Sequence, residues 1–192
     1  MIASLPVELM RAIRLTLVFA LVTGLLYSLA FTGIGQVIFP GQANGSLITR
    51  NGQVIGSALI GQEFKSDKYF QGRPQPYAAD NSSGSNLGPN NKALVDRVAS
   101  SARTSRAANG LAPDAQVPVD MVTYDFTGFD PDVSEATALL QVHRVAVARS
   151  LDESKVRALV EKYVQGRILW VFGEPRVNVL QLNLALDAGE AG

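Results

Sequence analysis

One stretch near the start of the chain limits what it can fold into. Residues 15–49 carry no charged side chain, and the first part of this stretch, residues 15–34, is apolar. As a helix it would be about 30 Å long, which matches the hydrocarbon thickness of a bilayer. The sequence therefore predicts a single transmembrane helix at residues 12–35, between a short N-terminal segment (1–11) and one further domain (36–192).

The basic residues around this stretch predict its orientation. Arg11 and Arg14 precede it, and no Lys or Arg follows until Arg50. The positive-inside rule therefore predicts a cytoplasmic N-terminus and an extracytoplasmic main domain. The alternative is a cleaved signal peptide ending near Ser28-Leu29-Ala30, although the apolar run exceeds the roughly 7 to 15 residues usual for one.

Small residues recur at every fourth position of the predicted helix. They are Ala12, Thr16, Ala20, Gly24, Ser28 and Thr32. Small side chains let a second helix approach closely in a membrane. We therefore predict helix packing through Ala20, Gly24, Ser28 and Thr32; the alternative is a chance spacing.

Composition excludes several classes of protein. Seventeen basic residues balance seventeen acidic ones, so the chain lacks the positive surplus that nucleic-acid binding requires. It has no Cys, which excludes disulfides and thiol nucleophiles, and its one His, His143, cannot form a His-rich zinc site. No metal site is expected.

After the membrane stretch, the pattern predicts both strands and helices. Residues 46–60 predict a β-hairpin turning at Asn51-Gly52, a pair that suits the positive φ angles of a type I′ turn. Residues 67–89 are rich in Gly, Ser, Asn and Pro and predict a long loop. Residues 91–109 predict an amphipathic helix packed on a core, stopped by Gly110.

The C-terminal half continues this mixture. Residues 117–123 and 168–172 predict short strands; Ser134 and Asp152 predict the N-caps of helices that run to about 149 and 166. Residues 177–186 predict a helix, with a strand as the alternative. Without regular alternation of strand and helix, the fold class is α+β.

Few residues suggest chemistry. His143 has no adjacent nucleophile motif, and Asp130 and Asp132, separated by a Pro, suit a turn or a cap better than a cation site. Thr137, Gln141 and Arg144 form a polar stripe on an otherwise apolar helix. If buried, they need partners, either within the chain or on a ligand or subunit.

A set of collinear motifs resembles the C subunit of the Kdp potassium-transporting ATPase. The motifs are Phe39-Pro40, Gln42 to Ile48, Gly56 to Gln62, Gly72-Arg73-Pro74, Gly84-Ser85-Asn86-Leu87, Val117-Pro118-Val119, Gln141-Val142 and Gly173 to Val179. They span nearly the whole chain.

The resemblance implies an accessory subunit in the plasma membrane of a bacterium. Its partners would be a channel-like potassium-binding subunit, a P-type ATPase subunit and a small membrane peptide, which together import potassium. It further implies a catalytic chaperone that promotes ATP binding by the ATPase subunit, with Gln141 as a nucleotide contact; no firmly bound cofactor is expected. The predicted topology conflicts with that role, because it puts Gln141 outside the cytoplasm, where ATP is found.

Two other functions stay open on the residues alone. One is a membrane-tethered extracytoplasmic enzyme, which the lack of a nucleophile–base pair disfavours. The other is an independent binding module that uses the loop 67–89.

Overall fold

The computed structural model describes residues 5–77, 80 and 82–191. The chain divides into two compact units, Met1–Leu47 and Ile48–Gly192. We describe each unit by itself.

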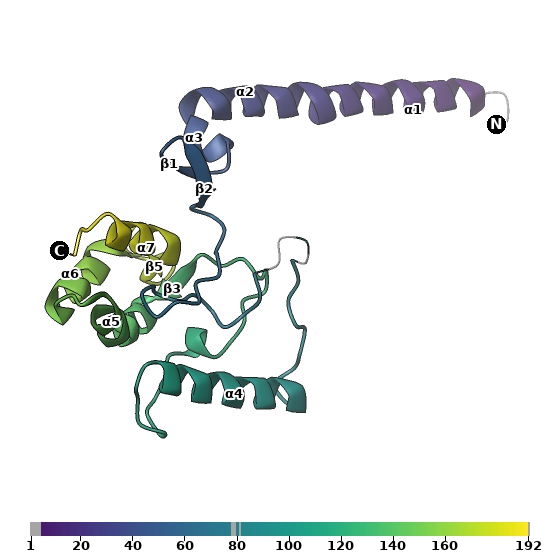
Figure 1. Cartoon of the computed structure of the whole chain (residues 1–192). Helices are drawn as coiled ribbons and strands as arrows, with labels where there is room; N and C mark the ends of the chain where they lie inside the picture. The colour runs from purple at the N-terminus through teal and green to yellow at the C-terminus, as the bar shows by residue number, and fades with distance from the viewer. Residues whose placement is uncertain (1–4, 78–79, 81, 192) are drawn as a thin grey trace. The chain divides into compact units, whose positions relative to one another are not determined.

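The first unit is dominated by one long helix. It comprises α1 (Leu5–Phe19), the π-helical segment η1 (Ala20–Tyr27) and α2 (Ser28–Ile38) without interruption, 34 residues in all (Figure 1). This length and its apolar composition suffice to cross a membrane. The helix ends at Phe39, which precedes Pro40 and leaves the helical conformation at φ −131°, because a residue before proline disfavours it. The short helix α3 (Pro40–Ala43) follows.

A β-hairpin comes next, as predicted. Its strands are β1 (Leu47–Arg50) and β2 (Gln53–Ser57). The turn residues Asn51 and Gly52 have φ values of 52° and 78°, which confirms the two positive φ angles that the sequence predicts.

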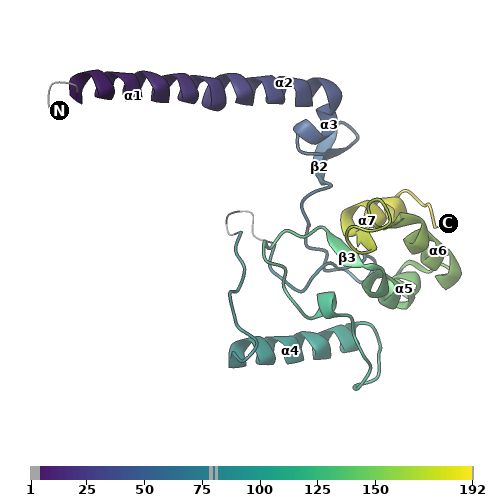
Figure 2. The same cartoon turned by 180° about the vertical axis from the view of Figure 1, so that it is seen from behind.

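The second unit holds four helices and a small sheet among its described residues. The helices are α4 (Lys92–Ala108), α5 (Glu135–Arg149), α6 (Glu153–Tyr163) and α7 (Val179–Asp187). The strands β3 (Asp132–Ser134), β4 (Val164–Gln165) and β5 (Arg176–Asn178) form an antiparallel sheet in the order β3-β5-β4. Figures 1 and 2 show α5, α6 and α7 gathered together, with α4 apart from them. The mixed α+β class is confirmed.

Side-chain capping explains where these helices begin. Ser134 accepts a hydrogen bond from the backbone N–H of Thr137, and Asp152 accepts one from Ser154. Each such cap satisfies a donor that the first turn of a helix leaves free. Both predicted caps are therefore confirmed.

The core lies between α5, α6, α7 and the sheet. Val177 of β5 pairs with Val133 on one side and Val164 on the other, so one buried residue joins all three strands to the core. Fully buried residues around it are Phe70, Ala138, Val142, Val145, Val156, Val160 and Leu182. Phe70 differs from the other residues, which lie in helices, because it belongs to the long loop.

Two predicted strands are wrong. Residues 117–123 contain only a short 3₁₀ turn, η2 (Val119–Met121). Residues 168–172 form a tight turn closed by a single bridge between Ile168 and Phe172. Short apolar runs of this kind do not distinguish a strand from a turn without their tertiary surroundings.

Other boundaries need smaller corrections. The predicted helix 177–186 begins only at Val179, because the two residues before it belong to β5. The helix after Asp152 ends at Tyr163, and Val164–Gln165 form β4. The helix 91–109 is confirmed, yet it contains no buried residue, and Val95 on its predicted core face is 55% exposed.

The predicted long loop is confirmed where the structure describes it. Among residues 67–77, 80 and 82–89 there is no helix or strand. Residues 78, 79 and 81 of that prediction lie outside the described part of the chain.

Candidate functional site

The polar stripe of α5 is buried. Thr137, Gln141 and Arg144 have exposed fractions of 0%, 1% and 8%. Removing such groups from water is unfavourable unless each finds a hydrogen-bond partner. All three find partners inside the second unit, so of the two possibilities that the sequence leaves open, this conformation has the internal one.

Gln141 holds the backbone of the long loop. Its Oε1 accepts a hydrogen bond from the N–H of Gln71 at 2.8 Å, and its Nε2 donates to the carbonyl oxygen of the same residue at 3.0 Å. Asn183 of α7 does the same for the preceding residue: it accepts from the N–H of Phe70 at 2.8 Å and donates to its carbonyl at 2.9 Å. We call Gln141 and Asn183, with the backbone of Phe70 and Gln71, the amide clamp.

The clamp replaces a missing strand partner. A buried extended segment must satisfy each backbone N–H and C=O, usually by pairing with a neighbouring strand. Here two side-chain amides present one donor and one acceptor to each residue in turn. The clamp thereby lets Phe70 enter the core from a loop.

The hydrogen-bonding capacity of Gln141 is fully used. Besides Gln71, its Oε1 accepts from Arg144 Nη2 at 2.6 Å and its Nε2 donates to the carbonyl of Thr137 at 3.3 Å. A glutamine amide offers two donors and accepts about two bonds. In this conformation a nucleotide would reach Gln141 only by displacing Gln71 or Arg144.

Arg144 joins three parts of the unit. Its Nε donates to Asn109 Oδ1 at 3.1 Å, and its Nη1 donates to the carbonyls of Asp67 and Tyr69 at 2.8 and 3.1 Å. Burial lowers the pKa of Arg144 below its ordinary value, while the Asp67 carboxylate, 3.8 Å away, opposes this effect. The guanidinium thus ties the end of α4 and the loop to α5.

A second carboxylate anchors the start of α5. Asp120, in the 3₁₀ turn, is 5% exposed and accepts bonds from Ser134 N, Ser134 Oγ and Thr137 Oγ1 at 2.6, 3.1 and 2.7 Å. A negative charge at a helix N-terminus is favoured by the helix dipole. The 3₁₀ turn found in place of the predicted strand serves to present this carboxylate.

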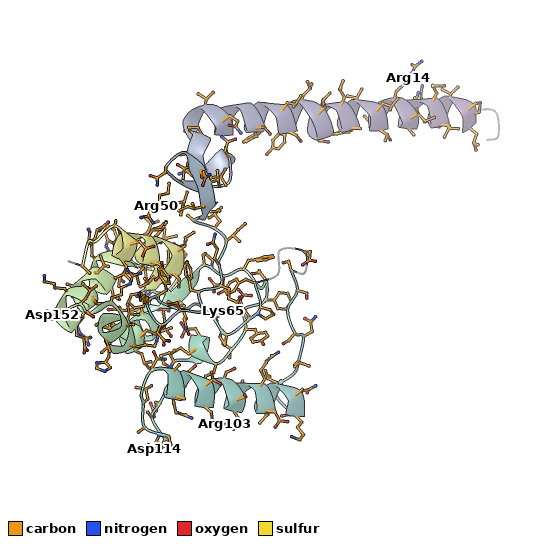
Figure 3. All side chains as sticks on the ribbon, in the orientation of Figure 1. Arg14, Arg50, Lys65, Arg103, Asp114 and Asp152 are labelled. Atoms are coloured by element: carbon orange, nitrogen blue, oxygen red, sulfur yellow. The ribbon has the colours of Figure 1, made fainter. Side chains whose placement is uncertain are left out.

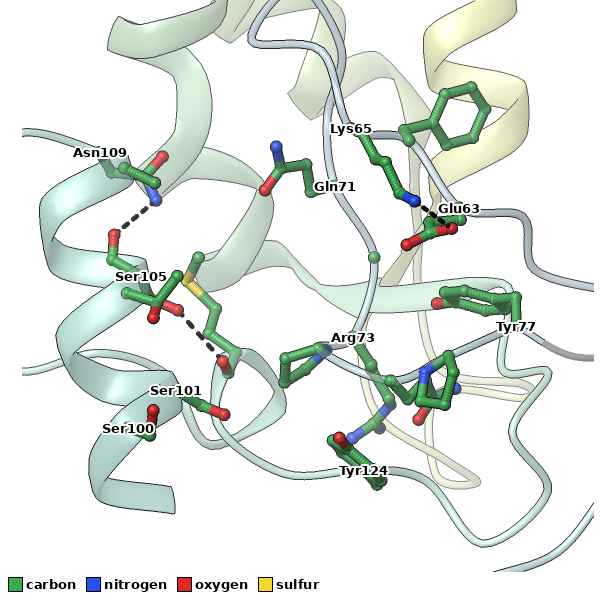
Figure 4. Close-up of a pocket in the computed structure, with 18 residues that line it drawn as sticks. Glu63, Lys65, Gln71, Arg73, Tyr77, Ser100, Ser101, Ser105, Asn109 and Tyr124 are labelled. Carbon is green, nitrogen blue, oxygen red and sulfur yellow. Dashed lines mark hydrogen bonds and ion pairs between the residues drawn. The ribbon is translucent and has the colours of Figure 1, made fainter. Parts of the chain in front are cut away.

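A cleft of about 520 Å³ with a mixed polar and apolar lining lies between the long loop and α4 (Figure 4). Ser105 and Asn109 lie on its α4 wall, and Gln71, Arg73 and Tyr77 lie on the loop side. The remaining lining residues include Glu63, Lys65, Ser100, Ser101, Thr104 and Tyr124. One wall of the cleft therefore lies next to the amide clamp.

Two of the polar residues that line the cleft, Arg73 and Gln75, already have partners. Arg73 donates to Asp130 Oδ2 at 2.8 Å, and Gln75 and Asp125 exchange two bonds of 2.8 Å each. Burial raises the pKa of Asp125, but Gln75 and three backbone N–H groups outweigh it, so the pKa lies below its usual range. Burial raises the pKa of Tyr77 to about 12.

Of the sequence candidates for catalysis, His143 lies apart from this cleft, whereas Asp130 pairs with the lining residue Arg73. His143 is exposed and pairs with Glu153 at 3.0 Å, and it does not line the cleft. Asp130 Oδ1 accepts a bond from the N–H of Asp132 at 3.0 Å, which confirms the expected turn role. Over the described residues, no group of three or more acidic or His side chains is placed to hold a metal ion.

The small residues of the long helix share a face. Ala20, Gly24, Ser28 and Thr32 are all exposed, and the Ser28 and Thr32 hydroxyls donate to backbone carbonyls of their own helix. Figure 3 shows side chains around the whole circumference of this helix, with Arg14 labelled on α1.

The π-helical segment affects this face. A four-residue step advances about 40° beyond a full turn in an α-helix, at 3.6 residues per turn. In the wider π-helix, the same four-residue step ends about 30° short of a full turn. Because η1 lies between two α-helical parts, the opposite drifts cancel in part and keep the small residues aligned.

Sequence reasoning missed the partners of the polar stripe. Asn183, like Gln181, is an amide side chain among the apolar residues of α7, and its position was the available signal for a buried amide. Gln71, Asn109 and Asp120 carry no comparable signal, because only the tertiary fold brings them to α5.

Comparison with known proteins covers almost the whole chain. The model of the family "K+-transporting ATPase, c chain" matches residues 9–188. A potassium-transporting ATPase KdpC subunit from Bradyrhizobium diazoefficiens is 53% identical over 96% of this chain and 98% of its own length.

Other relatives agree. KdpC subunits from Rhodopseudomonas palustris BisB18 and Methylobacterium nodulans are 53% and 49% identical, over 95% and 97% of this chain and 98% of each relative. The amide clamp, the cleft and the long apolar helix are thus features of a chain that belongs to the KdpC family, the c chain of K+-transporting ATPases.

Proposed function

We propose that this chain is a membrane-anchored accessory subunit of an ATP-driven potassium import complex. Family membership supports the potassium-transporting complex, and the single helix Leu5–Ile38 supports the anchor. The observation that carries the accessory role is the internal pairing of α5: its polar residues are used to hold the domain together. The chain also lacks the Asp-Lys-Thr-Gly motif of a P-type catalytic subunit.

In this proposal the helix spans the plasma membrane of a bacterium once. Arg11 and Arg14 lie at the cytoplasmic end, and the unit that begins at Ile48 lies outside. Its membrane partners are a channel-like potassium-binding subunit, a P-type ATPase subunit and a small membrane peptide. The second unit packs near the outer entrance of the channel-like subunit and stabilises the assembled state.

Cysteine labelling tests this topology cleanly, because the chain has no Cys of its own. In intact spheroplasts, Ser85→Cys should react with a membrane-impermeant maleimide, and Leu5→Cys should react only after permeabilisation. The reverse pattern would overturn the orientation, and removal of the helix from the mature protein would support a cleaved signal peptide instead.

We infer that any effect on ATP binding is indirect. The family resemblance implies a catalytic chaperone with Gln141 as a nucleotide contact. In the proposed topology Gln141 lies outside, so it acts on a cytoplasmic nucleotide site only through a change in the assembled complex. Substitution of Gln141 distinguishes the two roles, as argued in the Discussion.

A further inference from the structure

Five consecutive large apolar residues project from the turn between β4 and β5. Ile168, Leu169, Trp170, Val171 and Phe172 are 60%, 69%, 89%, 69% and 63% exposed. Single exposed apolar side chains are ordinary, but a contiguous patch on a protein usually marks a contact surface. We call residues 168–172 the apolar tip.

The backbone of the tip is ordered by its own hydrogen bonds. Ile168 and Phe172 exchange two bonds of 2.9 Å each, Val171 N donates to Ile168 O at 3.2 Å, and Trp170 N donates to Arg167 O at 3.3 Å. Four of the five N–H groups of the tip therefore have a partner inside the turn. These bonds hold the turn in one conformation without a contact from outside it.

The tip also holds an unfavourable conformation. Leu169 and Trp170 have φ values of 51° and 62°, in the left-handed region that costs about 1 to 2 kcal/mol for a residue with a Cβ. Strain of this kind persists only where the surrounding structure enforces it, and it is concentrated at functional sites. The result is a preformed hydrophobic projection.

Charge appears only at the base of the tip. Arg167 pairs with Glu174 at 2.6 Å, and the five residues between Arg167 and Gly173 are uncharged and apolar. Polarity thus decreases from base to end, with Trp170 the most exposed. Trp, with a large ring and one N–H donor, is the residue enriched where membrane meets water.

We propose that the apolar tip inserts into the interfacial layer of the lipid bilayer. The proposal rests on the proposed membrane anchoring of the same chain. The tip is apolar at its end and charged only at Arg167 and Glu174 in its base, and this gradient of polarity matches the boundary between lipid and water. The covalent helix also keeps the tip at a high effective concentration near the bilayer.

The lone Trp of the chain makes a direct probe. The full-length protein is reconstituted alone in vesicles of phosphatidylcholine and phosphatidylglycerol, and Trp170 emission is recorded. Insertion predicts a blue-shifted emission that is protected from aqueous acrylamide and strongly quenched when the lipids carry brominated acyl chains. Trp170→Phe gives the background signal.

Charged variants give the matched comparison. Leu169→Asp with Val171→Asp should return Trp170 to a water-like emission and abolish quenching by brominated lipid, with an unchanged circular dichroism spectrum. Val147→Asp, an equally drastic change at a residue of α5 that is 66% exposed, should leave the emission of Trp170 as in the unmodified chain.

The remaining outcomes separate this proposal from the anchoring on which it rests. A protein that floats with the vesicles but shows a water-like Trp170 overturns the insertion alone. A blue shift that arises only in the assembled potassium-transporting complex shows that a protein partner covers the tip, and also overturns it. A protein that does not float at all overturns the anchoring and the insertion together.

Discussion

At the scale of the residue, Gln141 is the side chain whose environment says most about the domain. It makes four hydrogen bonds while 1% exposed, and two of them replace the strand pairing of Gln71. An amide that is fully partnered in the interior contributes little net energy, but removing it leaves unpaired groups behind. Loss of the Gln141 side chain would therefore be unfavourable mainly because Gln71 and Arg144 would each lose a hydrogen-bond partner.

Gln141→Ala should lower the free energy of unfolding of the second unit by about 1 to 3 kcal/mol, because the backbone N–H of Gln71 is then buried without its partner. Thermal denaturation of the purified chain measures this. Gln181→Ala, a matched change at a half-buried position of α7, should have a much smaller effect.

The same variant tests the role implied by the family. In the assembled ATPase, Gln141→Ala should weaken assembly or stability and leave the apparent ATP affinity of the surviving complex unchanged. A normal melting temperature together with a weakened ATP response would show that Gln141 acts on the nucleotide.

We expect the phenol group of Tyr77 to lose its proton only at an unusually high pH. Burial raises its pKa to about 12, with the carboxylates of Asp125 and Asp130 adding to the effect and Arg73 opposing it. The unfolded chain loses this proton near pH 10, so the stabilisation is complete below that pH and is lost as pH rises toward 12. Absorbance near 295 nm should show a tyrosine ionising in that range, and Tyr77→Phe should remove that part of the titration.

At the scale of the element, the C-terminus of α5 shows a conformation that its residue does not favour. Ser150 adopts φ 56°, while its N–H and that of Leu151 bond back to the Ala146 carbonyl. This left-handed cap suits glycine. The backbone at the C-terminus of α5 is therefore strained, and a substitution at Ser150 can relieve that strain.

Ser150→Gly should raise the stability by about 0.5 to 1 kcal/mol, once the greater unfolded-state freedom of glycine is allowed for. Melting temperature is the measurement. Ser100→Gly, the same change at an exposed position inside α4, should shift the melting temperature in the opposite direction. A decrease for both variants would show that the Ser150 side chain has a role beyond the cap.

The long helix carries a second element-scale prediction. Gly24→Leu adds bulk at the smallest position of the aligned face, where nothing in the described structure lies within 4 Å of an added Cβ. Membrane insertion should be unaffected, since Leu is favourable in lipid, while co-purification of the other subunits in detergent should fall.

Leu21→Ala, on another face, serves as the control and should leave the yield of the complex unchanged. An unchanged yield for Gly24→Leu combined with Ser28→Leu would show that the four-residue spacing is accidental.

Sequence patterns succeeded where one local cause determines an element. Asn51-Gly52 set the hairpin turn, and Ser134 and Asp152 set two helix starts. They failed at residues 117–123 and 168–172, where an apolar run ends in a turn. The left-handed conformation of Trp170 contradicts the β-propensity of its side chain, and a positive φ is uncommon for any residue with a Cβ such as Leu169, so no local rule predicts this turn.

At the scale of the whole molecule, the sequence predicts a long apolar helix and an α+β domain, but not the candidate site. The polar stripe of α5 could be recognised, since its three residues lie on one helix. Its partners could not, because Gln71 is 70 residues from Gln141 and Phe70 is 113 residues from Asn183. Such distant pairs depend on the complete tertiary fold.

The amide clamp has a consequence for biosynthesis. The ribosome produces the loop around Phe70 long before α7 (Val179–Asp187), yet the hydrogen bonds that hold Phe70 in its buried position need Asn183 of that helix. Contacts so distant along the chain carry a loop-closure cost that delays them. The domain therefore completes its core only after α7 has been synthesised, and until then the loop around Phe70 is an apolar segment open to chaperones and proteases.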